Sequence, residues 1–240
     1  IVNDKHLVDT LLKLGINIKV IFAPEHGIRG KADAGEIISD SRDNTTGLPI
    51  ISLYGKKKKQ LPEDLKNIDV VRFDIQDVGV RFYTYISTLH YVMEACAENS
   101  IPLILLDRPN PNAYFVDGPL LDPAYKSFIG MHPVPVVYGM TIGEYAQMIN
   151  GEGWLSNKTS CHLTIVECKN YTHSSYYELP VKPSPNLPNI RSVLLYPSTC
   201  FFEGTTLSLG RGTEKQFQVI GHPKINSAFS FTPMPNEGAK

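Results

Sequence analysis

The sequence predicts an α/β fold, because short apolar runs alternate with amphipathic helices and because polar loops follow the apolar runs. Strand-like runs occur at 18–23, 69–73 and 101–106, and apolar residues recur at helical spacing in 4–14 and 83–99. Parallel strands need crossover helices that cover both faces of the sheet, so their sequences are almost continuously apolar. The first part of the chain is therefore expected to form a Rossmann-like parallel sheet.

The first helix and strand follow directly from local signals. Asn3 or Asp4 can cap a helix over 4–14, and Gly15 stands where a helix ends. The β-branched run at 18–23 is typical of a strand. We expect the order helix, strand, polar loop, repeated along the first half of the chain.

A change of pattern follows residue 150. The run 141–144 has capping-box spacing and predicts a helix to about Asn150. Beyond it, strand-like runs at 162–166, 192–196 and 218–220 lack long helices between them. We expect a Rossmann-like domain over 1–152 and the start of a smaller α+β subdomain over 153–240.

The chain begins with Ile rather than Met, inside a predicted helix. We therefore expect that any signal peptide preceding residue 1 is missing from it. The end of the chain shows no closing element, so the second subdomain is expected to be truncated.

Composition limits the classes of function. Hydrophobic residues make up 42% and charged residues 20%, the balance of a soluble protein with a large core. No apolar run is long enough to span a membrane. With 23 basic and 24 acidic residues the net charge is -1, which offers no general attraction to nucleic acid. The four scattered cysteines predict neither a disulfide framework nor a structural zinc site.

Cofactor motifs are also missing. The glycine-rich run at 202–213 lacks the GxGxxG order of a dinucleotide loop, and the sequence contains no phosphate-loop or HExxH motif. No cofactor and no metal is expected.

Polar residues that follow strands are the first site candidates, because ligands bind beyond the carboxyl ends of parallel strands. Such loops favour a functional site over a purely structural polar network, although both explanations stay open. Three loops supply Glu25, His26 and Arg29; then Asp74, Gln76, Asp77 and Arg81; then Asp107, Arg108 and Asn110.

Glu25 is the preferred general acid. It lies in a glycine-containing turn beside an apolar strand end, where burial favours the protonated carboxyl. It can instead accept backbone hydrogen bonds in the turn. His26 is as compatible with a hydrogen-bonded strut as with a catalyst. Asp74 and Asp77 can position a water or bind a cation, and capping of the next helix is an equal alternative for Asp77.

Other candidates have competing structural explanations. Glu94 stands about 15 Å along its predicted helix, so it reaches the crevice only if that helix begins late or tilts inward. Glu144 is explained as the capping-box glutamate. Glu203 and Arg211 can bind a sugar or a carboxylate, or can belong to a plain loop. Tyr83 is one of several aromatics near the crevice on which a sugar ring can stack.

Five ordered motifs together resemble the NamZ (YbbC-like) family of exo-β-N-acetylmuramidases. They are Pro24-Glu25-His26-Gly27 with Arg29-Gly30; Phe73 to Gly79 with Arg81 to Tyr85; Leu106 to Pro111; Pro183 to Pro188, which contains Asn186; and Phe202 to Thr205 with Gly210 to Thr213. The resemblance covers nearly the whole chain.

The resemblance implies a bacterial, exported glycosidase in the periplasm, on a lipoprotein or secreted. It would release N-acetylmuramic acid from the non-reducing end of peptidoglycan fragments such as MurNAc-GlcNAc, in cell-wall turnover. It also implies an active cleft between the Rossmann-like domain and the smaller subdomain. By the same resemblance, the chain lacks the strand region that opens the family's proteins before residue 1. Finally, the resemblance implies a catalytic pair of glutamates. Glu25 matches the first, and Glu94 is the first choice for the second, ahead of Glu203.

Two rival functions stay open, a metal-dependent hydrolase using His26, Asp74 and Asp77, and a saccharide-binding module without catalysis. For specificity, an arginine is expected to bind the lactyl carboxylate of muramic acid. Arg108 is the first candidate and Arg211 the second; pairing of Arg108 with a loop carboxylate is the structural alternative.

Overall fold

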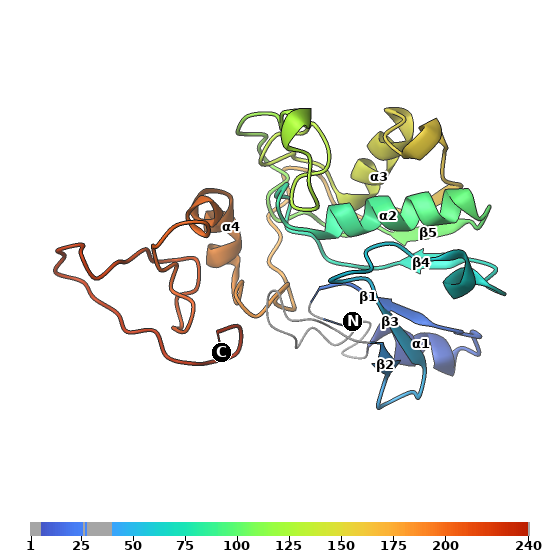
Figure 1. Cartoon of the computed structure of the whole chain (residues 1–240), viewed down its shortest axis with the longest axis horizontal. Coiled ribbons are helices and arrows are strands. Elements are labelled where there is room, and N and C mark those ends of the chain that lie inside the picture. Colours follow the sequence, from blue (N-terminus) through green and yellow to red (C-terminus); the bar gives the residue numbers. More distant parts are fainter. Residues whose placement is uncertain (1–5, 26, 28–39, 240) are drawn as a thin grey trace.

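The computed structural model describes residues 6–25, 27 and 40–239. Its longer elements, shown in Figure 1, are α1 (Leu7–Lys13), β1 (Ile21–Ala23), β2 (Ser41–Arg42), β3 (Pro49–Ser52), β4 (Val71–Phe73), α2 (Tyr85–Glu98), β5 (Leu103–Leu106), α3 (Ile142–Gly151), β6 (Leu163–Val166) and α4 (Ile190–Thr199). Short 3-10 turns occur at η1 (Pro62–Leu65), η2 (Pro123–Tyr125), η3 (Ser156–Lys158) and η4 (Cys200–Phe202).

The strands form two small sheets. In one, β1 pairs in parallel with β3, and β2 pairs with β3 in the antiparallel direction. In the other, the order is β4-β5-β6 and both pairings are parallel, with Val71 opposite Leu103 and Leu103 opposite Leu163. The predicted α/β class with parallel strands is confirmed. The short strands β2 and β3 were not predicted.

The main core lies between the β4-β5-β6 sheet and the helices α2 and α3, which are neighbours in Figure 1. Leu103 and Leu105 on β5 are fully buried, as are Leu89 and Met93 on α2 and Ile149 on α3. Burying side chains of this size stabilises the fold by about 1.5–3 kcal/mol each. This packing fixes the ends of β4 and β5, from which the candidate residues project.

Several local predictions are confirmed. α1 ends before Gly15, whose φ of 77° is the left-handed conformation expected at a helix end. Its N-cap is His6; the predicted caps Asn3 and Asp4 lie outside the described residues. The capping box at the start of α3 is present, with the Thr141 and Glu144 side chains each accepting the other residue's backbone N–H.

Two strand predictions in the second half are wrong. Residues 192–196 lie within α4, because the Asn189 side chain caps that helix by accepting the Ser192 N–H at 3.0 Å. Residues 218–220 form no strand, and only an isolated antiparallel bridge joins Ser208 to Gly221 nearby. The run at 162–166 does form a strand, β6.

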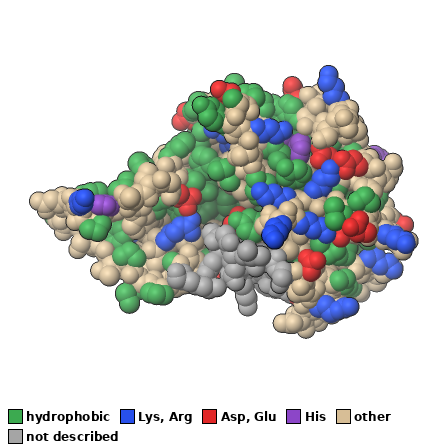
Figure 2. Space-filling view, viewed as in Figure 1, with side chains coloured by type: hydrophobic (Ala, Val, Ile, Leu, Met, Phe, Trp, Pro, Cys, Tyr) green, Lys and Arg blue, Asp and Glu red, His purple; other side chains and the backbone are tan. Residues whose placement is uncertain are grey.

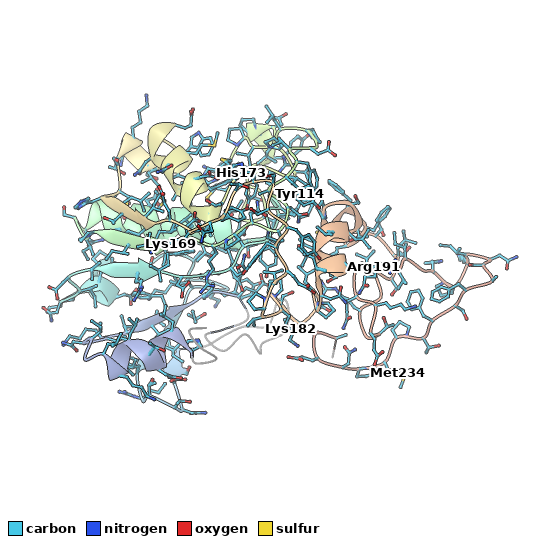
Figure 3. The ribbon with its side chains drawn as sticks, turned by 180° about the vertical axis from the view of Figure 1, so that it is seen from behind. Tyr114, Lys169, His173, Lys182, Arg191 and Met234 are labelled. Carbon is cyan, nitrogen blue, oxygen red and sulfur yellow. The ribbon has the colours of Figure 1, made fainter. Side chains whose placement is uncertain are left out.

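Because β6 pairs with β5, the sheet of the first domain continues beyond the boundary expected at 152–153. The chain from α4 onward extends away from the sheets and then turns back, with Arg191 on α4 and Met234 on the returning stretch (Figures 1 and 3). A second hydrophobic cluster, including Val78, Val193 and Phe217, joins this part to the loop after β4.

The surface carries both signs of charge. Figure 2 shows basic and acidic side chains interspersed over one face of the α/β part, in keeping with the net charge of -1. None of the helices in the described ranges has the length and apolar character needed to cross a membrane.

Candidate functional site

The loops after β4 and β5 meet at the carboxyl edge of the sheet, as their parallel pairing requires. Phe73, the last residue of β4, pairs with Leu105 of β5. Immediately beyond them, Arg108 Nε donates to Asp74 Oδ1 at 2.7 Å, and Arg108 Nη2 lies 2.5 Å from the same oxygen. This ion pair is the structural alternative that the sequence left open for Arg108.

The side chains of Gln76 and Asn110 form hydrogen bonds that connect the loops after β4 and β5 to each other and to neighbouring backbone. Gln76 Nε2 donates to the backbone oxygens of Asp77 and Pro109, both at 2.8 Å, so it ties one loop to the other. Asn110 Nδ2 donates to Met140 O at 2.8 Å, and its Oδ1 accepts from Asn112 N at 2.8 Å. Both side chains therefore shape the edge of the site, and their predicted contact with substrate stays a prediction.

Asp77 is buried beneath this edge. Its Oδ2 accepts hydrogen bonds from Gly79 N at 2.7 Å and from the Tyr138 hydroxyl, and its Oδ1 has no hydrogen-bond partner within the described residues. Burial raises the pKa of Asp77 to about 6, although the hydrogen bonds oppose the shift. The capping interpretation of Asp77 is wrong, because its carboxylate bonds to Gly79 N and to Tyr138, whereas α2 begins only at Tyr85.

Arg81 and Tyr83 are also buried. Arg81 Nη1 donates to Pro119 O at 2.7 Å and Val134 O at 2.6 Å. Tyr83 donates its hydroxyl to Pro183 O at 2.9 Å and packs edge-on against Tyr85. Burial raises the pKa of Tyr83 well above its ordinary value. In this arrangement both side chains support the loops, and neither presents an open face.

Glu25 lies two residues beyond β1 and contacts the start of α2. Thr84 Oγ1 donates to Glu25 Oε2 at 3.2 Å, and the Tyr85 hydroxyl donates to Glu25 O at 3.3 Å. Tyr54, two residues after β3, has a pKa raised to about 12 by burial and then by the nearby Glu25 carboxylate. These contacts bring the loop after β1 to the helix that follows the β4 loop. His26 and Arg29 lie outside the described residues.

Glu94 occupies the opposite end of α2. Its Oε2 lies 2.8 Å from Lys59 Nζ, and its Oε1 accepts the Ser156 N–H at 2.9 Å. Lys59 precedes β4 and Ser156 precedes β6, so this cluster lies at the amino edge of the sheet. Burial alone would raise the pKa of Glu94, but the Lys59 and Ser156 hydrogen bonds lower it to about 2. The structure therefore does not bring Glu94 to Glu25.

The remaining candidates lie in the C-terminal part. Glu203 and Arg211 form an ion pair with each other, and both side chains are one-third exposed. Asn186 is buried and donates from Nδ2 to Gly238 O at 2.9 Å. Among the described residues, no hydrogen bond or ion pair joins these three residues to Asp74 or Arg108.

A pocket of about 310 Å³ adjoins the ends of β5 and β6. It is lined by Asp107, Thr141, Gly143, Glu144, Gln147, Ile165, Glu167, Cys168, Tyr171, Thr172 and His173. Burial raises the pKa of Asp107. The Gly143 N–H opposes this rise, because it donates a hydrogen bond to Asp107 Oδ1 at 2.8 Å. The lining is mostly polar and supplies the hydroxyls and carboxylates that saccharide hydroxyls can bond.

Glu144 is a carboxylate of this pocket that the sequence analysis discounted. Besides completing the capping box, Glu144 contacts His173: Oε2 lies 2.8 Å and Oε1 3.0 Å from His173 Nε2. The Glu144 side chain is 43% exposed. His173, labelled in Figure 3, belongs to the loop after β6. The signal that could have found Glu144 is its position at the N-terminus of the helix beside β5 and β6.

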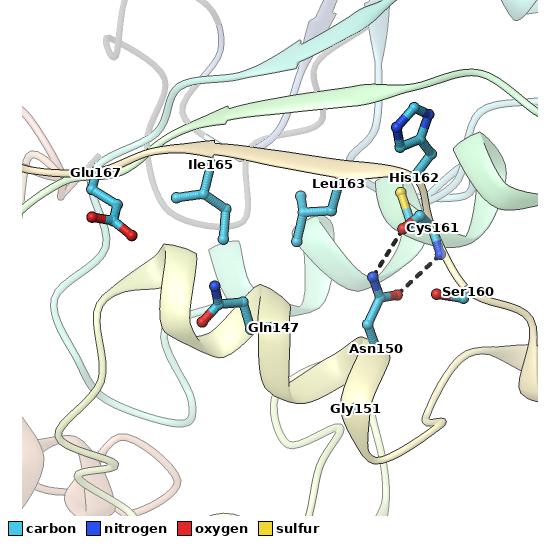
Figure 4. A pocket seen from close by; sticks show the side chains of 9 residues that line it. All are labelled: Gln147, Asn150, Gly151, Ser160, Cys161, His162, Leu163, Ile165 and Glu167. Carbon is cyan, nitrogen blue, oxygen red and sulfur yellow. Dashed lines mark hydrogen bonds between the residues drawn. The ribbon is translucent and has the colours of Figure 1, made fainter.

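A shallower groove of about 700 Å³ runs beside the first pocket, between α3 and β6 (Figure 4). Gln147, Ile165 and Glu167 line both hollows. Asn150 closes one end, because its side chain pairs with both the N–H and the C=O of Cys161. In the parts of the chain described, no three His, Cys, Asp or Glu side chains are grouped closely enough to hold a metal ion.

Similar proteins place the chain in a family. Residues 2–191 match the family model described as exo-beta-N-acetylmuramidase NamZ, N-terminal, and residues 194–238 match its C-terminal counterpart. Over 217 residues the chain is 49% identical to the peptidoglycan beta-N-acetylmuramidase NamZ of Bacillus subtilis (strain 168). This match covers 88% of this chain and 51% of that protein.

Two solved structures of DUF1343 family proteins from Bacteroides fragilis NCTC 9343 are also similar. The first has a TM-score of 0.91 and is 49% identical, and the match covers 100% of this chain and 64% of that protein's chain. The second has a TM-score of 0.83 and is 37% identical, and the match covers 92% of this chain and 57% of that protein's chain. The chain spans about half the length of its curated relative. Since the two family models together match almost every residue, this chain belongs to the NamZ family of exo-β-N-acetylmuramidases.

Proposed function

We propose that the protein is a glycosidase that releases N-acetylmuramic acid from the non-reducing end of peptidoglycan fragments. The observation that carries this proposal is the placement of Glu25: in a chain of the NamZ family, its carboxylate is held beside the start of α2 by Thr84. A carboxylic acid fixed at a loop beyond a strand end is suited to protonate a glycosidic oxygen.

In the proposed reaction, the Glu25 carboxyl gives its proton to the glycosidic oxygen while the bond from that oxygen to the anomeric carbon breaks. In an inverting reaction, a second carboxylate removes a proton from the water that attacks the anomeric carbon. In a retaining reaction, it attacks that carbon itself, and water, deprotonated by Glu25, then hydrolyses the sugar–enzyme ester. Glu144 fits this second role better than Glu94, because it is partly exposed in the pocket at the carboxyl edge. Glu94 is buried in an ion pair at the amino edge.

Recognition of muramic acid is proposed to involve Arg108. Its Nε and Nη2 are occupied by Asp74, whereas Nη1 has no hydrogen-bond partner among the described residues, and 28% of the side chain is exposed. A guanidinium held by one carboxylate can still donate to a second, such as the lactyl group of the sugar. Arg211 is the weaker candidate, because it pairs with Glu203 away from this edge.

The site of action follows from the substrate. Peptidoglycan lies outside the cytoplasmic membrane, so we propose that the protein acts there, as an exported, lipid-anchored or secreted enzyme of cell-wall turnover. The proposed partners are MurNAc-GlcNAc saccharides, with no cofactor.

The test is hydrolysis of a chromogenic N-acetylmuramide by the protein and by its Glu25→Gln variant. Loss of the proton donor is expected to lower kcat by at least about 100-fold while the melting temperature stays near that of the unmodified protein. Near-normal turnover by folded Glu25→Gln would exclude Glu25 as the acid. Loss of activity with a chelator would favour a metal-dependent hydrolase, and saccharide binding without turnover would favour a binding module.

A further inference from the structure

Thr84 occupies the N-cap position of α2 without acting as a cap. An N-cap threonine ordinarily accepts a hydrogen bond from a backbone N–H in the first turn, with its backbone extended. Thr84 instead has φ −75° and ψ 0°, and its side chain makes no capping bond. Its hydroxyl donates to Glu25 Oε2 at 3.2 Å. A group that would normally stabilise the helix is used to hold a carboxylate.

The next residue holds the same glutamate by its main chain. Tyr85 donates its hydroxyl to Glu25 O at 3.3 Å, and its ring is buried and packs edge-on against Tyr83 at 5.0 Å between centroids. Since Tyr85 is rigidly packed, the backbone of Glu25 is fixed relative to α2. The Thr84 bond then limits rotation of the carboxyl group itself.

We propose that Thr84 is a positioning residue for Glu25, orienting its carboxyl group for proton transfer to the glycosidic oxygen. The proposal rests on the proposed function, in which Glu25 is the acid. Proton transfer requires the donor and acceptor to lie within hydrogen-bond reach, and a misplacement of about 1 Å can cost about 100-fold in rate. Thr84 touches no reacting atom, so its effect must pass through Glu25.

The decisive variant is Thr84→Val, which keeps the shape and removes the hydroxyl. Thr88, one turn along α2, gives a matched control: it is buried, and within the described part of the chain its hydroxyl bonds only to the Thr84 carbonyl, at 3.3 Å. We expect Thr84→Val to lower kcat about 10- to 100-fold with KM changed less than about threefold. Thr88→Val is expected to stay within about threefold of normal, and Thr84→Ser to restore kcat.

A double variant separates positioning from substrate binding. On the Glu25→Gln background, Thr84→Val is expected to cause no further loss of the residual rate, because the two side chains act as one unit. An equal loss on both backgrounds would overturn the proposal. So would a kcat of Thr84→Val matching that of Thr88→Val. If Thr84→Val does not fold, Thr84→Ala provides the same comparison.

Failure of the proposed function gives a different pattern. If folded Glu25→Gln turns over the muramide normally, the assignment of the acid fails and the role of Thr84 fails with it. If Glu25→Gln is inactive while Thr84→Val is fully active, only the positioning role is refuted.

Discussion

Arg108 and Asp74 join the loops that follow β5 and β4, with both Nε and Nη2 of the arginine within 2.7 Å of one carboxylate oxygen. The Asp74 side chain is 11% exposed and that of Arg108 28%, so water weakens the pair only partly. The two strand ends are thus connected by charge as well as by backbone pairing. Removing either partner leaves the other poorly solvated.

The first prediction is energetic coupling between these two residues. Arg108→Met or Asp74→Asn alone is expected to lower the free energy of unfolding by about 1–3 kcal/mol, since each leaves an unpaired polar group. The double variant should lose less than the sum of the two. Urea unfolding of all four proteins measures the coupling, and additive losses would contradict it.

The second prediction concerns acid. His132 Nε2 lies 2.9 Å from His90 Nδ1, and both rings are buried. Burial lowers the pKa of His90 to about 4 and that of His132 to about 3. Below the ordinary histidine pKa near 6.5, the unfolded chain takes up protons that the folded chain does not, so stability falls as pH decreases from about 6.5 to about 4. The slope is up to about 1.4 kcal/mol per pH unit for each histidine.

Asp77 acts in the opposite direction. Its folded pKa of about 6 lies above its ordinary value of 3.8, so its contribution is present at low pH and is lost as pH rises through 6. Melting temperatures between pH 4 and 7.5 test the balance. The double variant His90→Gln, His132→Gln should lose most of the acid sensitivity, whereas the variant His162→Asn, at an exposed position, should keep it. Equal slopes in all three proteins would refute the histidine explanation.

The third prediction separates stability from catalysis at Glu94. Glu94→Gln is expected to lower the free energy of unfolding by about 1–3 kcal/mol, because it weakens a buried partner of Lys59. Glu98→Gln is the matched control, since Glu98 also pairs with Lys59, at 2.7 Å, but is 43% exposed; its cost should be below about 0.5 kcal/mol. Both variants should retain kcat within about threefold. Loss of turnover by folded Glu94→Gln alone would restore it as the second catalytic carboxylate.

The sequence predicted the parts of the fold that depend on periodicity and on local signals. Strands β4, β5 and β6, helices α2 and α3, and the Thr141 capping box all follow from such patterns. The adjacency of Asp74 and Arg108 also follows, because parallel strands bring their following loops together.

What the sequence did not settle depends on tertiary packing. Glu94 stands nine residues beyond the first residue of α2, which at 1.5 Å per residue is about 14 Å, and this distance carries it to the wrong edge of the sheet. Glu144 was discounted because its capping role was sufficient explanation, although its carboxylate also lines a pocket. The run 192–196 was mistaken for a strand because a short apolar run fits a strand and a buried helix equally well. The Asn189 cap, which begins α4, is the signal that separates the two.

The last prediction compares two glycines at opposite ends of α3. Gly143 packs against the carboxylate of Asp107: an added Cβ would lie 2.8 Å from Asp107 Cγ and 3.0 Å from each carboxylate oxygen. The Gly143 N–H also donates to that carboxylate at 2.8 Å, so neither group can move away without losing the bond. At Gly151, the last residue of α3, an added Cβ would meet no atom within 4 Å.

Gly143→Ala is therefore expected to cost about 1–3 kcal/mol through overpacking, which for a chain of this size lowers the melting temperature by several degrees. Gly151→Ala should instead stabilise the protein by about 0.4–1 kcal/mol, because alanine loses less conformational entropy on folding and meets no obstacle. Since Asp107 lines the pocket that contains Glu144, Gly143→Ala should also reduce kcat/KM on the muramide, whereas Gly151→Ala should not. Thermal unfolding and kinetics of the two variants test both statements. A Gly143→Ala protein as stable and as active as Gly151→Ala would show that Asp107 can yield, and that close contact at this helix start does not fix the pocket.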